Sequence, residues 1–478
     1  MGYLSRLLGN PKYNSNPADY GVGDFNGDGV DDVIFAGPSW SNGTWDGISW
    51  SPVLLKSNGV GQYEIEIANQ LTSTIHTRVI ESGDLNNDGQ DDFFFFDHGH
   101  DISPFSGAPN AAFFSSGTAL QNAEIPTFND YSHGGDIGDV DGDGDLDILS
   151  LSMSGYSSTI LLNDGAGLFS ATTLGVSGSI KDPSWHSDPW EIPYTLTSET
   201  ETFFNTAKLD DFTGDGLVDL LVGGQHYGHS FVAENLGDGT FDLENAKELP
   251  TSAFFTGVLG TNEQLMEAVA TDLNGDGLND IIGSYTTPSY SGRALQIFVN
   301  NGDATFRDES TARFPNGDNV DPNGQWVPDL ELTDFNNDGH FDVSLIHGSL
   351  EQANNAAFVG APVTDIPIMM LNDGTGRFSL LTGADLGIGN LAVIPVTGGY
   401  IHHNSGILSE SGATENWQGV SEIYFMSGSY GTAGNGQDGA DLGAPGFNED
   451  FYLNSNPEIR SLVKTGQLES GLTHYLAS

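Results

Sequence analysis

Short apolar segments alternate along most of the chain with segments rich in aspartate and glycine. Runs such as DVIF, DFFFF, DILSL and DLLV each start on the last aspartate of an aspartate-rich nonapeptide. Short runs bounded by turn-forming residues predict β-strands. The nonapeptides begin at Asp24, Asp84, Asp139, Asp211, Asp272 and Asp334, at spacings of 60, 55, 72, 61 and 62 residues. This recurrence predicts one supersecondary unit that is repeated.

A second motif follows each nonapeptide by about the length of a strand, a turn and a strand. The copies are LKSNGVGQY at 55–63, LLNDGAGLF at 161–169, ENLGDGTF at 234–241, VNNGDATF at 299–306 and LNDGTGRF at 371–378, with AAFFSSGTALQN at 111–122 as a degraded copy. Asn-Asp-Gly and Gly-Asp-Gly between apolar runs predict tight hairpin turns. Each unit is therefore expected to be a four-stranded antiparallel blade, with the nonapeptide between its first and second strands.

The nonapeptides, such as DVDGDGDLD from Asp139, crowd carboxylates with almost no cation nearby, which requires a counter-charge. Positions 1, 3, 5 and 9 offer side-chain oxygens, position 6 is glycine, and position 7 can offer a backbone carbonyl. Hard oxygen ligands in this order resemble the first half of an EF-hand loop and predict calcium, about six ions in all. The predicted ligands are Asp24, Asn26, Asp28, Val30, Asp32, Asp84, Asn86, Asp88, Gln90, Asp92, Asp139, Asp141, Asp143, Asp145, Asp147, Asp211, Thr213, Asp215, Leu217, Asp219, Asp272, Asn274, Asp276, Leu278, Asp280, Asp334, Asn336, Asp338, His340 and Asp342.

The nonapeptides depart from an EF-hand after position 9. Position 12 is never glutamate, so the aspartate at position 9 is expected to complete the ligand shell, and strands flank the loops in place of helices. The alternative is a set of Asx-rich turns without metal.

The two motifs in fixed order resemble the FG-GAP/VCBS repeats of integrin-like β-propellers over about residues 17–433. This resemblance implies an all-β, seven-bladed β-propeller of four-stranded antiparallel blades. Only six nonapeptides are present, and the sequence near residue 396, VTGGYIHHNSGIL followed by SEIYFMSGSYG, has strand character without the carboxylates. We expect this segment to form a seventh blade without calcium; a six-bladed ring is the alternative.

The remaining segments flank the predicted propeller. Residues 1–16 form an N-terminal segment, 434–446 a glycine-rich linker and 447–478 a small helical segment, with a helix start at Asn456 and Pro457. The last segment is similar to short helical repeats near the ends of large secreted bacterial proteins. It could cap the propeller or anchor it.

Composition narrows the partners and the location. Against 66 acidic residues there are 13 lysines and arginines, for a formal net charge of −53. Nucleic acid and anionic membrane surfaces are therefore poor partners, because both are bound through basic patches. No segment is long and apolar enough for direct membrane insertion. The chain has no cysteine, and its N-terminus lacks a signal-peptide core. We expect a bacterial protein that is exported without an N-terminal signal peptide and folds outside the cell or at its surface.

All seven tryptophans fall in connections predicted to lie opposite the calcium loops. The insertion KDPSWHSDPWEIPY combines two of them with a histidine, acidic residues and prolines. Aromatic residues on rigid loops are typical of a recognition surface, although they could also only pack the insertion onto its own blade. The predicted ligand-binding residues are Trp40, Trp45, Trp185, His186, Asp188 and Trp190.

Three functions fit this sequence. The favoured one is calcium-dependent binding of a glycan or an extracellular protein, as in adhesion or recognition. The alternatives are a polysaccharide lyase or other carbohydrate-active enzyme, and a structural subunit that self-assembles into a surface layer or filament. No nucleophile motif is present and no catalytic residue is predicted, so an enzyme is less expected. His98, His100 and Asp101 could form a transition-metal site, but loop hydrogen bonding explains them better.

Overall fold

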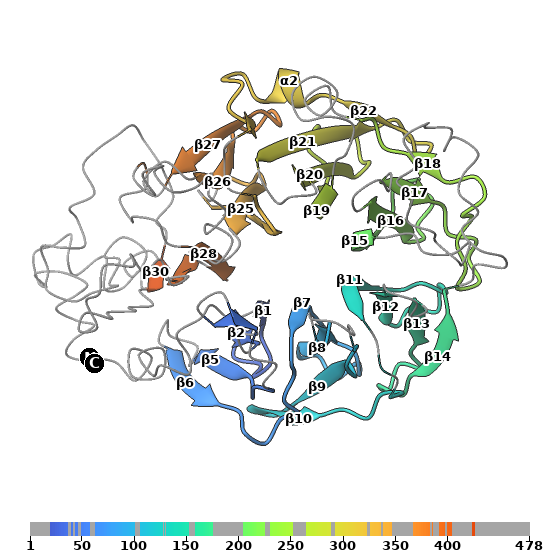
Figure 1. Ribbon diagram of the computed structural model, residues 1–478, viewed down its shortest axis with the longest axis vertical. Coiled ribbons are helices and arrows are strands. Elements are labelled where there is room, and N and C mark those ends of the chain that lie inside the picture. The colour runs from blue at the N-terminus through green and yellow to red at the C-terminus, as the bar shows by residue number, and fades with distance from the viewer. Residues whose placement is uncertain are drawn as a thin grey trace, which may run out of the picture.

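The protein is a ring of antiparallel β-sheets around a central axis, a β-propeller (Figure 1). The computed structural model describes residues 20–36, 40–41, 44–45, 49–57, 63–100, 106–127, 129, 131–152, 158–174, 204–224, 230–251, 264–287, 292–322, 326–335, 338–346, 367–382, 385, 392–396, 399–403 and 423–425.

The first three blades each contain four antiparallel strands in sequence order from the axis outward, apart from a small hairpin inserted in the first blade. Their strands are β1 (Tyr20–Gly23), β2 (Asp32–Phe35), β5 (Val53–Ser57) and β6 (Tyr63–Ile67); β7 (Thr77–Gly83), β8 (Asp92–Asp97), β9 (Ala111–Ser116) and β10 (Ala119–Asn122); and β11 (Ser132–Gly138), β12 (Asp147–Ser152), β13 (Thr159–Leu162) and β14 (Ser170–Thr173). The inserted hairpin pairs β3 (Trp40–Ser41) with β4 (Thr44–Trp45).

The next three blades repeat this arrangement. Their strands are β15 (Phe204–Asp210), β16 (Asp219–Gly224), β17 (Phe231–Ala233) and β18 (Lys247–Glu248); β19 (Gln264–Thr271), β20 (Asp280–Thr286), β21 (Arg293–Asn300) and β22 (Phe306–Asp308); and β24 (Asp329–Thr333), β25 (Asp342–Ile346), β26 (Pro367–Asn372) and β27 (Phe378–Thr382). In the fifth blade, β23 (Val320–Asp321) also pairs with β21.

The prediction of seven four-stranded blades is wrong. The described chain has six sheets with four strands in a row, and the next sheet has only three: β28 (Ala392–Val396), β29 (Gly399–His403) and β30 (Ile423–Phe425). Figure 1 shows β28 between the sixth blade and the first. Because Val396 pairs with Gly399, two residues separate β28 from β29, which leaves no room for a nine-residue loop between them.

Strand structure dominates the described residues, and their one helix is the single turn α2 (Ser310–Arg313). The predicted segments at 1–16, 434–446 and 447–478, including the expected helix, lie outside the described residues. No helix in the described ranges is long and apolar enough to cross a membrane.

The hydrophobic core lies between the blades. The second strand of each blade has a strand on both sides and packs against neighbouring blades, so it is buried and mostly apolar. The strand β8 accordingly reads DFFFFD with every residue buried. Clusters of buried side chains join blades 1 and 2, 2 and 3, 3 and 4, 4 and 5, and 5 and 6. Stability of the ring therefore depends on contacts between adjacent blades.

Candidate calcium centres between the first and second strands

Six loops of the same shape connect the first strand of each blade to the second, all at one end of the ring. The glycine at position 6 has a positive φ in every loop, from 86° to 97°. Residues with a side chain rarely adopt this conformation, which explains the glycine there. The sharp turn lets the loop fold back over its first aspartate.

The first aspartate of each loop accepts hydrogen bonds from the backbone ahead of it. In the first loop, Asp24 Oδ1 accepts from the Asp28 N–H at 3.1 Å, and Asp24 Oδ2 accepts from the Gly29 N–H at 2.7 Å. The other five loops have the same pair of bonds. These Asx-type turns shape the loop without metal, so the loop geometry alone does not decide between the two interpretations of the motif.

At position 7 only the backbone takes part in the hydrogen bonds that recur in every loop. Its N–H donates to the carboxylate at position 5 in all six loops, at 2.9–3.0 Å. Because the side chain has no part in this bond, residues as different as Val30, Asp145 and His340 occupy the position.

The aspartate at position 9 joins three segments of its blade. All six of these residues are fully buried. In the third loop, Asp147 Oδ1 accepts from the Asn163 N–H at the end of the third strand, and Asp147 Oδ2 accepts from the Val140 N–H inside the loop. The Oδ1 bond to the third strand recurs in every blade. This aspartate therefore has a structural task in addition to its predicted role as a ligand.

Burial gives these carboxyl groups unusual acidities. Loss of hydration disfavours the charged form. It raises the pKa of Asp32, Asp92 and Asp342 to about 7 and that of Asp147 and Asp280 to about 6. It also raises the pKa of Asp219 above its usual value. A bound cation would favour the ionised form of each group.

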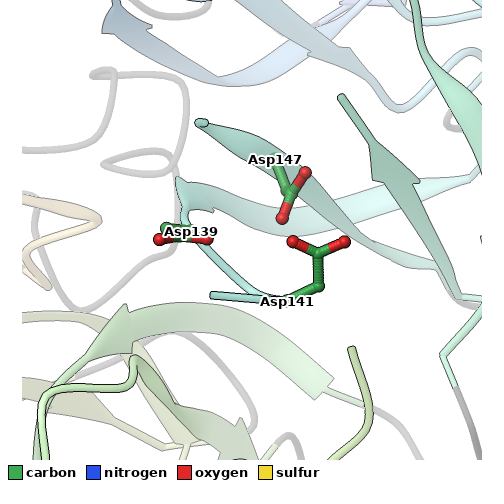
Figure 2. Close-up of side chains that lie close together, drawn as sticks. All are labelled: Asp139, Asp141 and Asp147. Atoms are coloured by element: carbon green, nitrogen blue, oxygen red, sulfur yellow. The ribbon is translucent and has the colours of Figure 1, made fainter. Parts of the chain in front are cut away.

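The third loop brings three carboxylates together. Ligand atoms of Asp139, Asp141 and Asp147 lie within 4.8 Å of one another, and Figure 2 shows the three side chains around the start of β12. Asp141 Oδ1 is buried and has no hydrogen-bond partner in the described part of the chain. Three hard oxygen ligands, one of them otherwise unsatisfied, could hold a metal ion and suit calcium.

The other loops have fewer acidic groups at the corresponding point. Position 3 is an amide in the loops from Asp24, Asp84 and Asp272, and it is Thr213 in the fourth. Within the described ranges, the triad of the third loop is the one place where three acidic or imidazole ligand atoms come this close. Asn336, the predicted ligand at position 3 of the sixth loop, lies outside the described residues.

An asparagine of the second motif connects three of the loops to the preceding blade, a role that the sequence did not reveal. Asn235 Nδ2 donates to Val218 O of its own loop at 2.8 Å and to Val140 O of the preceding loop at 2.9 Å. Asn163 and Asn300 make the equivalent pairs of bonds. The available signal was an asparagine that recurs just before the hairpin turn. Three successive loops are thereby linked to their neighbours.

The predicted ligand-binding residues are only partly within the described chain. Trp40 pairs with Trp45 across the β3–β4 hairpin, which lies in the connection between β2 and β5, at the end of the first blade away from its aspartate-rich loop. The side chains of these two residues are outside the description, as are Trp185, His186, Asp188 and Trp190 entirely.

Comparison with known proteins identifies the repeat. A model of the FG-GAP-like repeat matches residues 24–95, 211–282 and 272–344. The chain thus carries FG-GAP-like repeats in a β-propeller, as the two motifs predicted. No curated protein sequence matches it.

The comparison with solved structures gives matches at low sequence identity and low TM-score. AofleA from Arthrobotrys oligospora is 10% identical, with a TM-score of 0.39 over 78% of this chain and 88% of that chain. The V. cholerae biofilm matrix protein Bap1 is 14% identical, with a TM-score of 0.31 over 69% of this chain and 41% of that chain. Bacillus licheniformis rhamnogalacturonan lyase PL11 is 13% identical, with a TM-score of 0.31 over 76% of this chain and 68% of that chain. Similarity at this level does not extend to function.

Proposed function

We propose that this protein is a calcium-dependent β-propeller that binds a glycan or protein ligand outside the cell, through the face opposite the calcium loops. The observation that carries the proposal is the sixfold recurrence of one loop with a buried aspartate at position 9. Each loop carries aspartates at positions 1, 5 and 9, and about six calcium ions would offset the mutual repulsion of these carboxylates. In each loop the side chains at positions 1, 3, 5 and 9 and the carbonyl at position 7 would hold the ion.

The ligand-binding part of the proposal is supported by the connections at the other end of the ring. The β3–β4 hairpin, with Trp40 and Trp45, lies at that end. The tryptophan-rich insertion around Trp185 and Trp190 falls in the connection from β14 of the third blade to β15 of the fourth, and these two strands also end and begin there. Indole faces can stack on the apolar faces of sugar rings, and nearby carboxylates can accept hydroxyl hydrogen bonds. A neutral or amino sugar suits this chain, with its net charge of −53, better than an anionic polymer does.

Two measurements test the two parts separately. Calorimetric titration of chelator-treated protein with calcium is expected to show about six sites and a higher melting temperature; fewer than four sites would contradict the calcium proposal. A glycan array probed in calcium is expected to give a ligand whose affinity falls at least tenfold in Trp185→Ala/Trp190→Ala, about 1.4 kcal/mol. Leu168→Ala is the matched control, because Leu168 is 63% exposed at the end of the ring that carries the calcium loops. Unchanged affinity in the tryptophan variant with a lower melting temperature would show that these residues only stabilise the insertion.

A further inference from the structure

Three histidines from two blades gather at the end of the ring away from the calcium loops. His76 directly precedes β7, His98 directly follows β8, and His133 lies in β11. The ring centroid of His98 lies 5.1 Å from that of His76 and 4.9 Å from that of His133. His98 and His133 are buried, and His76 is only partly buried, so the cluster reaches solvent on the His76 side.

A buried carboxylate holds the backbone that carries two of these rings. Asp97 is 2% exposed and accepts hydrogen bonds from the N–H groups of Ile75 and His76, at 2.7 and 2.8 Å, and of Gly99 at 3.0 Å. Asp97 N–H in turn donates to Asn110 Oδ1. The segments on both sides of the cluster are therefore fixed from within the protein.

The hydrogen bond of His98 determines which of its nitrogens can bind a ligand. His98 Nδ1 lies 3.2 Å from the Ser132 carbonyl oxygen, which can only accept, so Nδ1 carries the proton and Nε2 carries the lone pair. Histidines that bind metals commonly donate their other N–H to a backbone carbonyl in this way. Tyr131, whose ring centroid is 3.8 Å from that of His98, restricts the imidazole from one side.

We propose that His76, His98 and His133 form a binding site for a zinc-like transition-metal ion, distinct from the calcium loops. Neutral imidazole suits zinc, copper and nickel, whereas carboxylate and carbonyl oxygens suit calcium. A Zn–N distance of about 2.0–2.1 Å in tetrahedral geometry puts the centroids of two ligating rings roughly 5 Å apart, close to the two separations found here. The nitrogens of the three rings do not all lie within 4.8 Å of one another, as the ligand atoms of the Asp139 triad do, so binding requires the rings to rotate until their nitrogens converge, with water completing the shell on the His76 side.

The competing explanation is that the three rings only fill the space between the second and third blades. The two explanations differ in the effect of removing a single nitrogen. In His98→Asn, the side-chain amide can keep the donor to Ser132 O while the Nε2 ligand is lost. His76→Gln removes the least buried ring and is the variant less expected to disturb folding. His474→Gln is a histidine control distant in sequence from the cluster.

The test uses the full-length protein in saturating calcium, so that the oxygen sites do not compete for the probe. Zn²⁺ titration is expected to show one additional site, and Co²⁺ in its place is expected to give the visible absorption of tetrahedral nitrogen coordination. His98→Asn and His76→Gln should each weaken Zn²⁺ binding at least tenfold, with the melting temperature in zinc-free buffer reporting on folding, while His474→Gln binds as the wild type does. The proposal is overturned if calcium-saturated wild type takes up no Zn²⁺, or if folded His76→Gln binds Zn²⁺ with wild-type affinity.

Discussion

Replacing Lys208 by methionine is expected to destabilise the ring from its centre. Lys208 Nζ lies 2.7 Å from Glu81 Oε1 and 4.0 Å from both Asp136 Oδ1 and Glu267 Oε1. These four residues come from β15, β7, β11 and β19, four successive innermost strands. Asp329 and Glu331 of β24 and Arg78 line the same axial cavity of about 190 Å³. One ammonium group thus faces carboxyl groups from most of the blades.

The expected loss follows from these distances. At an effective dielectric constant of about 20, opposite unit charges attract by about 6 kcal/mol at 2.7 Å and about 4 kcal/mol at 4.0 Å. Desolvation of the ammonium offsets much of this attraction, and removing one partner from a buried ionic network costs about 3–5 kcal/mol. Because the Lys208 side chain is still 21% exposed, we expect the lower end of that range, about 3 kcal/mol.

The loss is expected to depend on pH in a defined direction. Burial raises the pKa of Asp136 to about 7 and that of Glu267 to about 8. Carboxyl groups whose pKa is raised on folding bind protons in the folded state that the unfolded state has lost, so stability falls as pH rises from about 4 to about 8. Without Lys208 their pKa rises further, and this fall continues to a higher pH. The difference between wild type and Lys208→Met should therefore be larger at about pH 9 than at about pH 6.

Urea unfolding in saturating calcium at both pH values measures this difference. Arg307→Met is the matched control, because the Arg307 side chain is 49% exposed and pairs with Glu309 at 2.7 Å; a surface pair of this kind contributes at most about 1 kcal/mol. A Lys208→Met loss no larger than that of the control, or a larger loss at the lower pH, would refute the reasoning.

Three further predictions concern the aspartate-rich loops between the first and second strands. Asn235→Ala removes the donor shared by two carbonyls and should lower the free energy of unfolding by about 1–3 kcal/mol in urea titrations, whereas Asn245→Ala, at an exposed turn, should change it little. In Gly144→Ala the added Cβ meets no atom within 4 Å, but the residue must hold a φ of +97°, so the substitution should cost about 1 kcal/mol of strain. Calorimetry should then show weaker calcium binding at the third loop, and wild-type affinity would contradict this. In chelator, the melting temperature should fall as pH rises from about 4 to about 7. Aspartates in the unfolded chain ionise at a lower pH than buried ones such as Asp147, whose pKa is about 6, so the folded state holds more protons over this range. Calcium binds the ionised form and should therefore weaken or reverse this trend.

The repeated unit was predictable because its chemistry is local. Nine consecutive residues specify each loop, and glycine at position 6, such as Gly29 with a φ of 86°, marks the turn directly. The hairpin motif likewise predicts its turn from a few consecutive residues. Both motifs together define a four-stranded blade before any long-range contact is considered.

Features that depend on separate blades meeting were not predictable. The number of complete blades was missed because the segment after the sixth lacks both motifs, so nothing local fixed its strands. Lys208 and Glu81 are 127 residues apart in sequence, and their ion pair requires the ring to close. The ring also has to close before His76, His98 and His133 come together. The sequence shows only the local pair His98 and His100. The asparagine of the second motif was visible, but its bond to the preceding blade was not.

The aspartates that flank the buried second strands also matter before the protein has folded. The Phe93–Phe96 run is fully buried in the ring, and in an unfolded chain it would be a strongly aggregation-prone segment, apolar and with high β-propensity. Asp92 and Asp97 enclose it at both ends, and charged residues in those positions oppose the edge-to-edge association of such segments. Because the whole chain carries a net charge of −53, newly made molecules also repel one another. The carboxylates at position 9 thus oppose aggregation of the unfolded chain, and in the folded protein they hold the segments of each blade together.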